Sequence, residues 1–219
     1  LLAENDTKAE STYLEQQGEA LTADMVYYSE KIPYKFDYNT TDLDVSHGTN
    51  TDSSDHGTHV AGITCADPTN VMNGHEGYYC RGVAPKAQLA VMKVFNDHGT
   101  GARWDYIMNA IEDSIYIGAD VVNMSLGSPS GFPSTDPEFH EIYDTLDTYG
   151  VSLIVAAGNE TSSAYDSTWG TNNTTTENID SGVVDSPSTY KDSLSIAAIN
   201  NTHKYYRDYI WLLVSLHLV

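Results

Sequence analysis

Residues 55–62 read Asp-His-Gly-Thr-His-Val-Ala-Gly, and residues 156–160 read Ala-Ala-Gly-Asn-Glu. Each stretch surrounds one functional side chain with small residues: the imidazole of His56 in the first and the carboxamide of Asn159 in the second. An imidazole titrates near neutral pH, which suits a general base in acyl transfer. A carboxamide donates hydrogen bonds to an oxyanion without competing as a base. The two stretches together predict a catalytic site.

Two other interpretations of these stretches compete with catalysis. His56 and His59 stand at i and i+3, with His47 and Cys65 nearby, and all four are zinc-ligand types. Zinc sites of this kind usually add a tighter second pair of ligands or a helical Glu, and neither is found, so zinc is disfavoured. A His-x-x-His at a helix start, or Gly-Asn in a strand-ending turn, also occurs without any chemistry. The complete string at residues 55–62 argues against that second alternative.

The rest of the chain alternates apolar runs with helical patterns. The run Ala87–Phe95 is almost continuously apolar, which is typical of a strand buried on both faces. Apolar residues from Ile107 onward recur at helical spacing and end at Gly118. Further strands are expected at 119–126, 151–157 and 194–199, a helix at 137–149, and an extended segment at 31–38. Helices placed between strands indicate crossover connections, so the sequence predicts an α/β three-layer domain with a mainly parallel central sheet.

Candidate substrate-binding residues follow two of these strands. Val122-Asn123-Met124 continues as Ser125, Leu126 and Gly127, and in open α/β sheets ligands bind beyond the carboxyl ends of strands. Such a segment offers backbone N–H and C=O groups to an extended peptide, and Gly127 keeps side chains out of the way. Gly158 precedes Asn159 at the end of another strand. Taken alone, Ser-Leu-Gly is a weak signal, because any strand-to-loop junction can end in this way.

In order and separation, these segments resemble the signature segments of subtilisin-like serine peptidases (subtilases). The resemblance covers about residues 54–200, and Gly-Val-Ala-Pro-Lys-Ala-Gln-Leu at 82–89 supports it. It implies that His56 is the general base and acid, that Asn159 is the side-chain oxyanion donor, and that Ser125–Gly127 pairs with substrate backbone. The long polar segment before the His motif is similar to that of cell-envelope subtilases of Gram-positive bacteria, such as lactocepin.

The family resemblance also implies a subtilisin-like fold and a serine endopeptidase that hydrolyses extracellular polypeptides. It implies a secreted or cell-envelope location. It allows calcium as a cofactor, although no contiguous calcium-ligand loop is identifiable and no metal-ligating residue is assigned.

Two members of the family's catalytic triad are not found in these 219 residues. The family's order is Asp, His, Ser. Upstream of Asp55 no Asp has Gly two positions later, and no buried strand is expected before any of them. Every Gly-Thr is followed by Asn, His or Gly, so no Gly-Thr-Ser supplies a nucleophile. The sequence therefore predicts an internal fragment that is inactive by itself, with a central sheet incomplete at both chain ends.

Composition limits the partners. The formal charge of −21 argues against nucleic acid and anionic membrane, since both require clustered cations. The apolar stretch Ile210–Val219 is far shorter than the roughly 20 residues that span a bilayer, so no membrane span is expected. A monomer is expected. Cys65 and Cys80 fit a disulfide across one loop and two free thiols equally well.

The expected organisation is a polar segment at 1–53, a partial peptidase domain at 54–200 and a tail at 201–219 that is foreign to the fold. Leu1–Ala3 is too short for the apolar part of a signal peptide, so the chain is expected to start within a longer one. Three functional hypotheses stay open at this point: the middle portion of a serine endopeptidase, a non-catalytic pseudopeptidase that binds extended peptides, and a gene fragment that does not fold.

Overall fold

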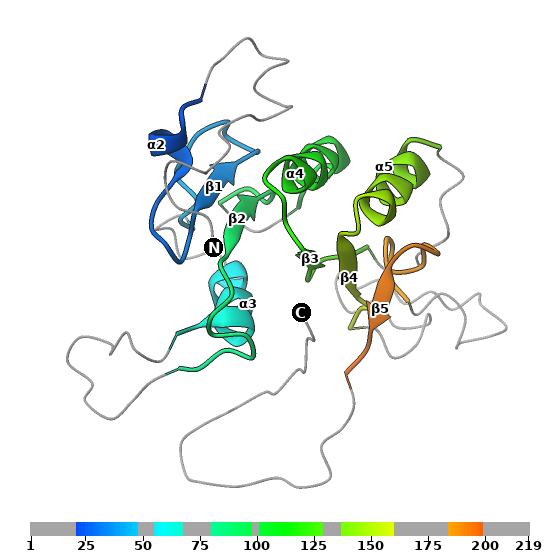
Figure 1. Ribbon diagram of the computed structural model, residues 1–219. Helices are drawn as coiled ribbons and strands as arrows, with labels where there is room; N and C mark the ends of the chain where they lie inside the picture. Colours follow the sequence, from blue (N-terminus) through cyan, green and yellow to red (C-terminus); the bar gives the residue numbers. More distant parts are fainter. Residues whose placement is uncertain are drawn as a thin grey trace, which may run out of the picture. The chain divides into compact units, whose positions relative to one another are not determined.

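The computed structural model describes residues 21–47, 55–67, 80–97, 101–128, 137–159 and 184–198. In chain order, the elements are α2 (Ala23–Val26), β1 (Tyr34–Asp37), α3 (His56–Cys65), β2 (Ala90–Lys93), α4 (Trp104–Tyr116), β3 (Val121–Met124), α5 (Pro137–Thr148), β4 (Ser152–Ala156) and β5 (Leu194–Ile196) (Figure 1). The predicted tail at 201–219 lies outside the described residues.

The chain divides into two compact units, with the boundary inside β3. Unit 1 comprises Leu1–Val122 with Thr148–Val151, and unit 2 comprises Asn123–Asp147 with Ser152–Val219. The segments predicted at 1–53, 54–200 and 201–219 are not tested by this division, and they stay predictions.

Parallel strand pairing confirms the α/β class. In unit 1, β1 pairs with β2 in parallel, from Tyr34 opposite Ala90 to Asp37 opposite Lys93. The second sheet has three strands in the order β3-β4-β5, and β4 pairs with β5 in parallel, with Ala156 opposite Ile196. Helices α3 and α4 lie between β1 and β3 along the chain, and α5 lies between β3 and β4, as the alternating pattern predicted (Figure 1).

Two strands are less buried than the sequence predicted. All four residues of β2 are half-buried, and Val121 at the start of β3 is exposed. The apolar pattern predicted buried strands at both places. Among the described residues, however, β2 has β1 as its neighbour and β3 has β4, so each has a single partner strand.

An aromatic core anchors unit 1. Tyr34, Phe36 and Tyr38 alternate along one face of β1 and its continuation, and all three side chains are buried. The Phe36 and Tyr38 rings meet edge-on with centroids 4.9 Å apart. The Tyr38 hydroxyl donates to Oδ2 of the fully buried Asp113 on α4 at 2.6 Å, and the Tyr34 hydroxyl donates to the same oxygen at 3.4 Å. These hydrogen bonds join α4 to β1 and satisfy a buried carboxylate.

Helix α4 forms where the spacing predicted it. The buried residues of this helix include Ile107, Ala110 and Ile111, which recur at helical spacing. Asp105 lies in the first turn, where its negative charge complements the helix dipole. Gly118 follows the helix at φ 75°, a left-handed conformation that favours glycine after a helix end.

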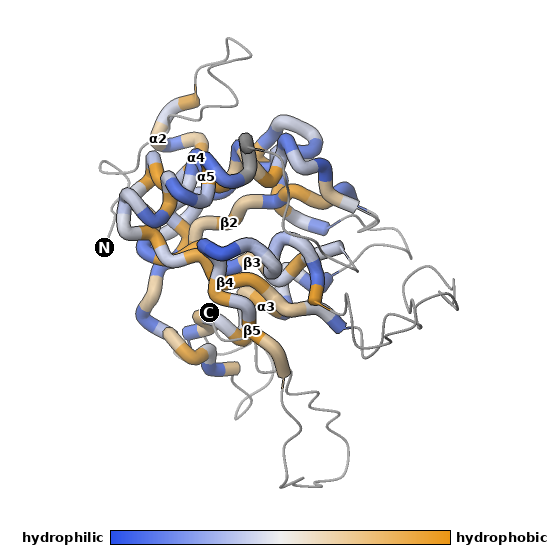
Figure 2. Tube along the Cα trace, turned by 90° about the vertical axis from the view of Figure 1, so that its right-hand side faces the viewer, coloured by the Kyte–Doolittle hydropathy of each residue, from blue (hydrophilic) through white to orange (hydrophobic). Residues whose placement is uncertain are grey.

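The core of unit 2 is formed by buried residues of β4 and α5 together with Tyr190. Figure 2 shows a hydrophobic run along β4, and its Leu153, Ile154 and Val155 are buried. On α5, Tyr143 is buried, and its ring centroid lies 5.2 Å from that of Tyr190. Within the described part of the chain, no helix is both long and apolar enough to cross a bilayer.

Candidate active site

His56 is the first residue of α3, and its side chain is exposed. The N-cap Asp55 provides no side-chain capping hydrogen bond, but its carbonyl accepts from the His59 N–H at 3.0 Å and so starts the helical pattern. The predicted base therefore stands at the solvent-facing start of a helix in unit 1.

The far end of α3 is fixed by the loop that follows residue 80. The N–H groups of Gly82, Val83 and Ala84 donate to the carbonyls of Ala66, Ile63 and Thr64 at 2.8–2.9 Å. These bonds satisfy carbonyls that a helix end would otherwise leave without partners. A Cβ at Gly82 would lie 2.4 Å from the Cys65 nitrogen, so this position requires glycine.

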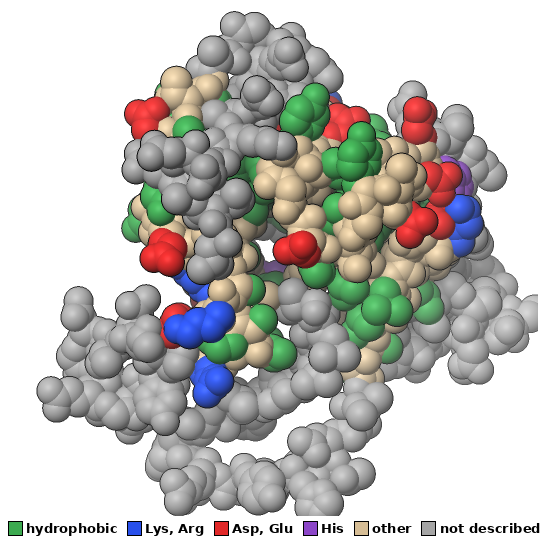
Figure 3. Space-filling model, in the orientation of Figure 1, with side chains coloured by type: hydrophobic (Ala, Val, Ile, Leu, Met, Phe, Trp, Pro, Cys, Tyr) green, Lys and Arg blue, Asp and Glu red, His purple; other side chains and the backbone are tan. Residues whose placement is uncertain are grey.

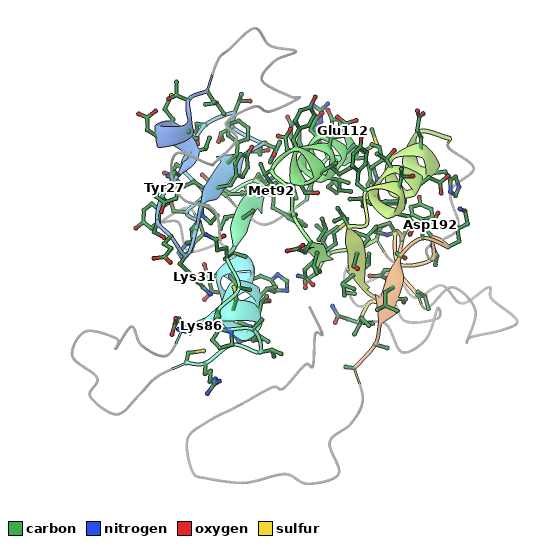
Figure 4. The ribbon with its side chains drawn as sticks, in the orientation of Figure 1. Tyr27, Lys31, Lys86, Met92, Glu112 and Asp192 are labelled. Carbon is green, nitrogen blue, oxygen red and sulfur yellow. The ribbon has the colours of Figure 1, made fainter. Side chains whose placement is uncertain are left out.

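Lysine side chains add to this support (Figure 4). Lys31 Nζ donates to the Pro85 carbonyl at 2.9 Å, and Lys86 Nζ lies 3.1 Å from Asp67 Oδ2. Cys65 and Cys80 are both free thiols, one buried and one exposed, which decides the alternative that the sequence left open. Burial raises the pKa of the Cys65 thiol. The motif's glycines stand apart from this packing, since a Cβ at Gly57 or Gly62 would meet none of the described residues within 4 Å.

Ser125, Leu126 and Gly127 follow β3 in unit 2, as predicted. The Asn123 amide Nδ2 donates to the Ser125 hydroxyl at 3.1 Å, which holds that side chain beside the strand. Ser125 and Leu126 are half-buried and Gly127 is exposed. The next residue, Ser128, forms an antiparallel bridge with Ser186 through N–H···O contacts of 2.9 and 3.0 Å. This bridge fixes where the segment leaves the sheet.

Gly158 and Asn159 follow β4 in the same unit, and both are exposed. The Ala157 N–H donates to the Ile196 carbonyl at 2.8 Å, and the Ala157 carbonyl accepts from the Asp185 N–H at 2.8 Å. Gly158 then turns the chain at φ 114°, a conformation that L side chains rarely adopt. The predicted oxyanion donor therefore follows a backbone turn that requires glycine.

Asp185 is the residue that sequence reasoning missed. Its buried carboxylate lies against both predicted glycines: a Cβ at Gly127 would be 2.7 Å from Asp185 Cβ, and one at Gly158 would be 2.7 Å from its Cγ and Oδ1. Val184-Asp185-Ser186-Pro187 matches no motif, and its contacts are distant along the chain, so only the fold brings it here.

One expectation about aspartates is wrong. Asp37 ends β1, a buried strand, although no buried strand was expected before any Asp upstream of Asp55. Its Oδ1 accepts from the N–H groups of Asn39 and Thr40 at 2.8 and 3.2 Å, and its Oδ2 accepts from Lys93 Nζ at 2.6 Å. Partial burial lowers the pKa of Lys93, but its hydrogen bonds to Asp37 and Asp97 outweigh this and raise that pKa. These contacts give Asp37 the role of holding the turn after β1.

Calcium cannot be assigned to residues of the described part of the chain. No group of three or more His, Cys, Asp or Glu side chains gathers there in a way that could hold a metal ion. On the face drawn in Figure 3, acidic side chains are spread over several elements. Asp44 Oδ1, for example, accepts from the N–H and hydroxyl of Ser46, which lowers the pKa of Asp44.

The structure thus brings the predicted Gly127 and Gly158 together around one carboxylate in unit 2, close to Asn159 in the chain. His56 belongs to unit 1.

Comparisons with known proteins agree on one family. The model of the subtilase family matches residues 10–209. The PIII-type proteinase of Lactococcus lactis subsp. cremoris (strain SK11) is 37% identical over 187 residues, which cover 80% of this chain and 9% of that proteinase. Subtilisin amylosacchariticus of Bacillus subtilis subsp. amylosacchariticus is 34% identical over 153 residues, or 70% of this chain and 33% of that subtilisin.

Among solved structures, sphericase superposes with a TM-score of 0.52 at 27% sequence identity, covering 77% of this chain and 47% of sphericase. The likeness of fold agrees with the strand pairing described above. With a family match over most of its length and the His, Ser-Leu-Gly and Asn segments in order, the chain belongs to the subtilase family.

Proposed function

We propose that this chain is the middle portion of a serine endopeptidase that cleaves extracellular polypeptides by a Ser-His-Asp mechanism. His56 acts as the general base and then the general acid, and Asn159 donates to the oxyanion. Ser125–Gly127 and Gly158 contact the backbone of the bound substrate. The single observation that carries the proposal is the exposure of both motif side chains at element ends, His56 at the start of α3 and Asn159 just after β4.

These roles follow from the chemistry of acyl transfer. A base at the exposed start of a helix can reach a hydroxyl nucleophile and a leaving amine, because neither has to enter the core. A carboxamide after a glycine turn can donate to the charge that develops on the carbonyl oxygen. In subtilisin such a donor is worth roughly 100–1000-fold in turnover.

A protein of these 219 residues alone is proposed to be inactive. Its sequence holds no Gly-Thr-Ser, and Asp37, the aspartate that ends a buried strand, has its carboxylate engaged by Lys93 and two turn amides. Loss of one central triad member removes nearly as much rate as loss of all three.

The location, partners and cofactor remain proposals from the family. We place the protein outside the cell or on the cell envelope, acting on polypeptides as a monomer. The family allows calcium as a cofactor, and no step above depends on it.

Two experiments test the function. The purified chain should neither hydrolyse a fluorogenic peptide nor be labelled by a serine-directed fluorophosphonate, and specific labelling would overturn the claim of inactivity. The DNA that flanks this frame should encode Asp-Thr-Gly upstream and Gly-Thr-Ser downstream. A protein can then be expressed that includes these flanking segments. In that protein, His56→Ala should lower turnover by about a million-fold and Asn159→Ala by about 100–1000-fold. An active His56→Ala variant would contradict the mechanism.

A further inference from the structure

We propose that Asp185 selects the substrate, favouring a polypeptide with a lysine or arginine side chain where it crosses Gly127 and Gly158. This inference rests on the proposed function, because it takes these two glycines as substrate-binding residues. It adds a residue that carries none of the family motifs quoted above.

Geometry is the first support. The Asp185 carboxylate lies beneath two exposed glycines, so close that a side chain on either one would collide with it. Neither glycine has a side chain that could stand between this carboxylate and a peptide lying across Gly127 and Gly158. Because both positions are glycine, a substrate backbone can approach the Asp185 carboxylate closely.

The framework around Asp185 is rigid, which is the second support. The Asp185 N–H donates to the Ala157 carbonyl at 2.8 Å, beside Gly158. On its other side, Ser186 bridges Ser128, beside Gly127. Asp185 is thus tied by backbone bonds to both substrate-binding segments, and its carboxylate stays between them without costly ordering when a substrate binds.

The charge of the neighbourhood is the third support. Among the described residues of unit 2, Lys191 is the one Lys or Arg, and its ammonium lies 3.0 Å from Asp144 and 2.9 Å from Asp192. The negative potential near Gly127 and Gly158 therefore favours a cation on the substrate and disfavours an acidic side chain. We expect the attraction between this carboxylate and a cation on the substrate to give about a tenfold preference.

The test measures binding of fluorescein-labelled nonapeptides of Ala, Ser and Val to the intact chain by fluorescence anisotropy. The central residue is Lys, norleucine or Glu. A fourth peptide has the composition of the Lys peptide but carries its lysine at the amino end. This isomer controls for general attraction to a chain of charge −21.

The proposal expects the central-Lys peptide to bind about tenfold more tightly than the norleucine peptide and its own isomer, with the Glu peptide weakest. Asp185→Asn should bring the ratio of the affinities for the central-Lys and norleucine peptides close to one. Asp144→Asn, which removes an equal charge from an exposed site on α5, should preserve the preference.

The possible failures are distinguishable. If all four peptides bind equally well to the unmodified chain, the selectivity of Asp185 is wrong and the peptide-binding edge stands. If none binds, the edge itself, and with it this part of the proposed function, is wrong. A preference that survives Asp185→Asn assigns the selectivity to another residue and overturns the inference. If Asp185→Asn does not fold, Asp185→Ser replaces it in this test, and equal binding of the four peptides by the unmodified chain overturns the inference by itself.

Discussion

The start of α3 in unit 1 and the strand ends of unit 2 both carry motif glycines, but they pack in opposite ways. Among the described residues, a Cβ at Gly57 or Gly62 would meet nothing within 4 Å, whereas at Gly127 and Gly158 it would collide with Asp185. The proposed substrate-binding edge is therefore tightly packed within unit 2. At the start of the histidine helix, the described residues leave space beside the glycines. A glycine in a motif therefore does not by itself show that a side chain would be excluded there, because this depends on which residue the fold places beside it.

The largest expected effect is at Gly158. Replacing it with valine adds a strained backbone at φ 114° to a collision with the Asp185 carboxylate, so the free energy of unfolding should fall by about 3 kcal/mol in urea denaturation. Gly57→Ala should instead raise it by about 0.5 kcal/mol, because alanine favours the helix and meets open space. Equal losses at the two positions would contradict the comparison.

A double-variant cycle separates the two causes at Gly158. The atoms that a Cβ would strike are Cγ, Oδ1 and Oδ2 of Asp185, and Asp185→Ala removes all of them. Gly158→Ala should therefore cost less in the Asp185→Ala background than in the parent chain. Identical costs would place the whole effect in the backbone conformation.

The next effect concerns the core of unit 1. Tyr38→Phe removes the 2.6 Å hydrogen bond to the buried Asp113 carboxylate and should lower the free energy of unfolding by about 2 kcal/mol. Tyr149, which is exposed, is the matched control, and Tyr149→Phe should change it by less than about 0.5 kcal/mol. Chemical denaturation of both variants decides whether the buried bond stabilises unit 1.

Alkaline pH should weaken both units. Burial, with Tyr34 and Asp113 nearby, raises the pKa of Tyr38, and burial beside Tyr190 raises that of Tyr143. Because each folded pKa lies above its unfolded value near 10, the stabilisation is complete below pH 10 and is lost as pH rises above it. Each tyrosine should contribute a loss of about 1.4 kcal/mol per pH unit.

Two tyrosine variants show which unit loses stability at alkaline pH. Tyr143→Phe should reduce the dependence of unfolding on pH above 10 through unit 2, and Tyr38→Phe should do so through unit 1. An unchanged dependence in both variants would show that other groups cause it.

A smaller effect than that of Tyr38→Phe is expected at the turn after β1. Thr41 is a β-branched residue at φ 61°, in a turn closed by the bridge between Asp37 and Asp42. Thr41→Asn should raise the free energy of unfolding by about 1 kcal/mol, because asparagine tolerates this conformation better. The same substitution at Thr40 should give no such gain, and a loss at Thr41 would point to a contact of its side chain.

Much of the fold was predictable because its signals are local. The apolar spacing of α4 and the glycine after it set that helix within a few residues, and the run at β4 was equally clear. The burial of β2 and β3 was overestimated, since an apolar run does not reveal how many neighbours a strand has.

Part of the site could not be predicted. The His, Ser-Leu-Gly and Asn segments can be recognised in the sequence because their chemistry needs small residues around one polar group. Asp185 and Asp37 gain their roles from partners in other elements, through contacts that no local pattern encodes. The sequence located the chemical groups, and the fold supplied the residues that surround them.

The central claim is that the strand ends of unit 2 form the edge that binds an extended peptide. Hydrogen–deuterium exchange of the chain, with and without the central-Lys nonapeptide, tests it most directly. The account predicts slower exchange at residues 125–128 and 157–159 when peptide is bound, with the far end of α3, at 60–65, unchanged. No protection at the strand ends, or protection confined to unit 1, would contradict it.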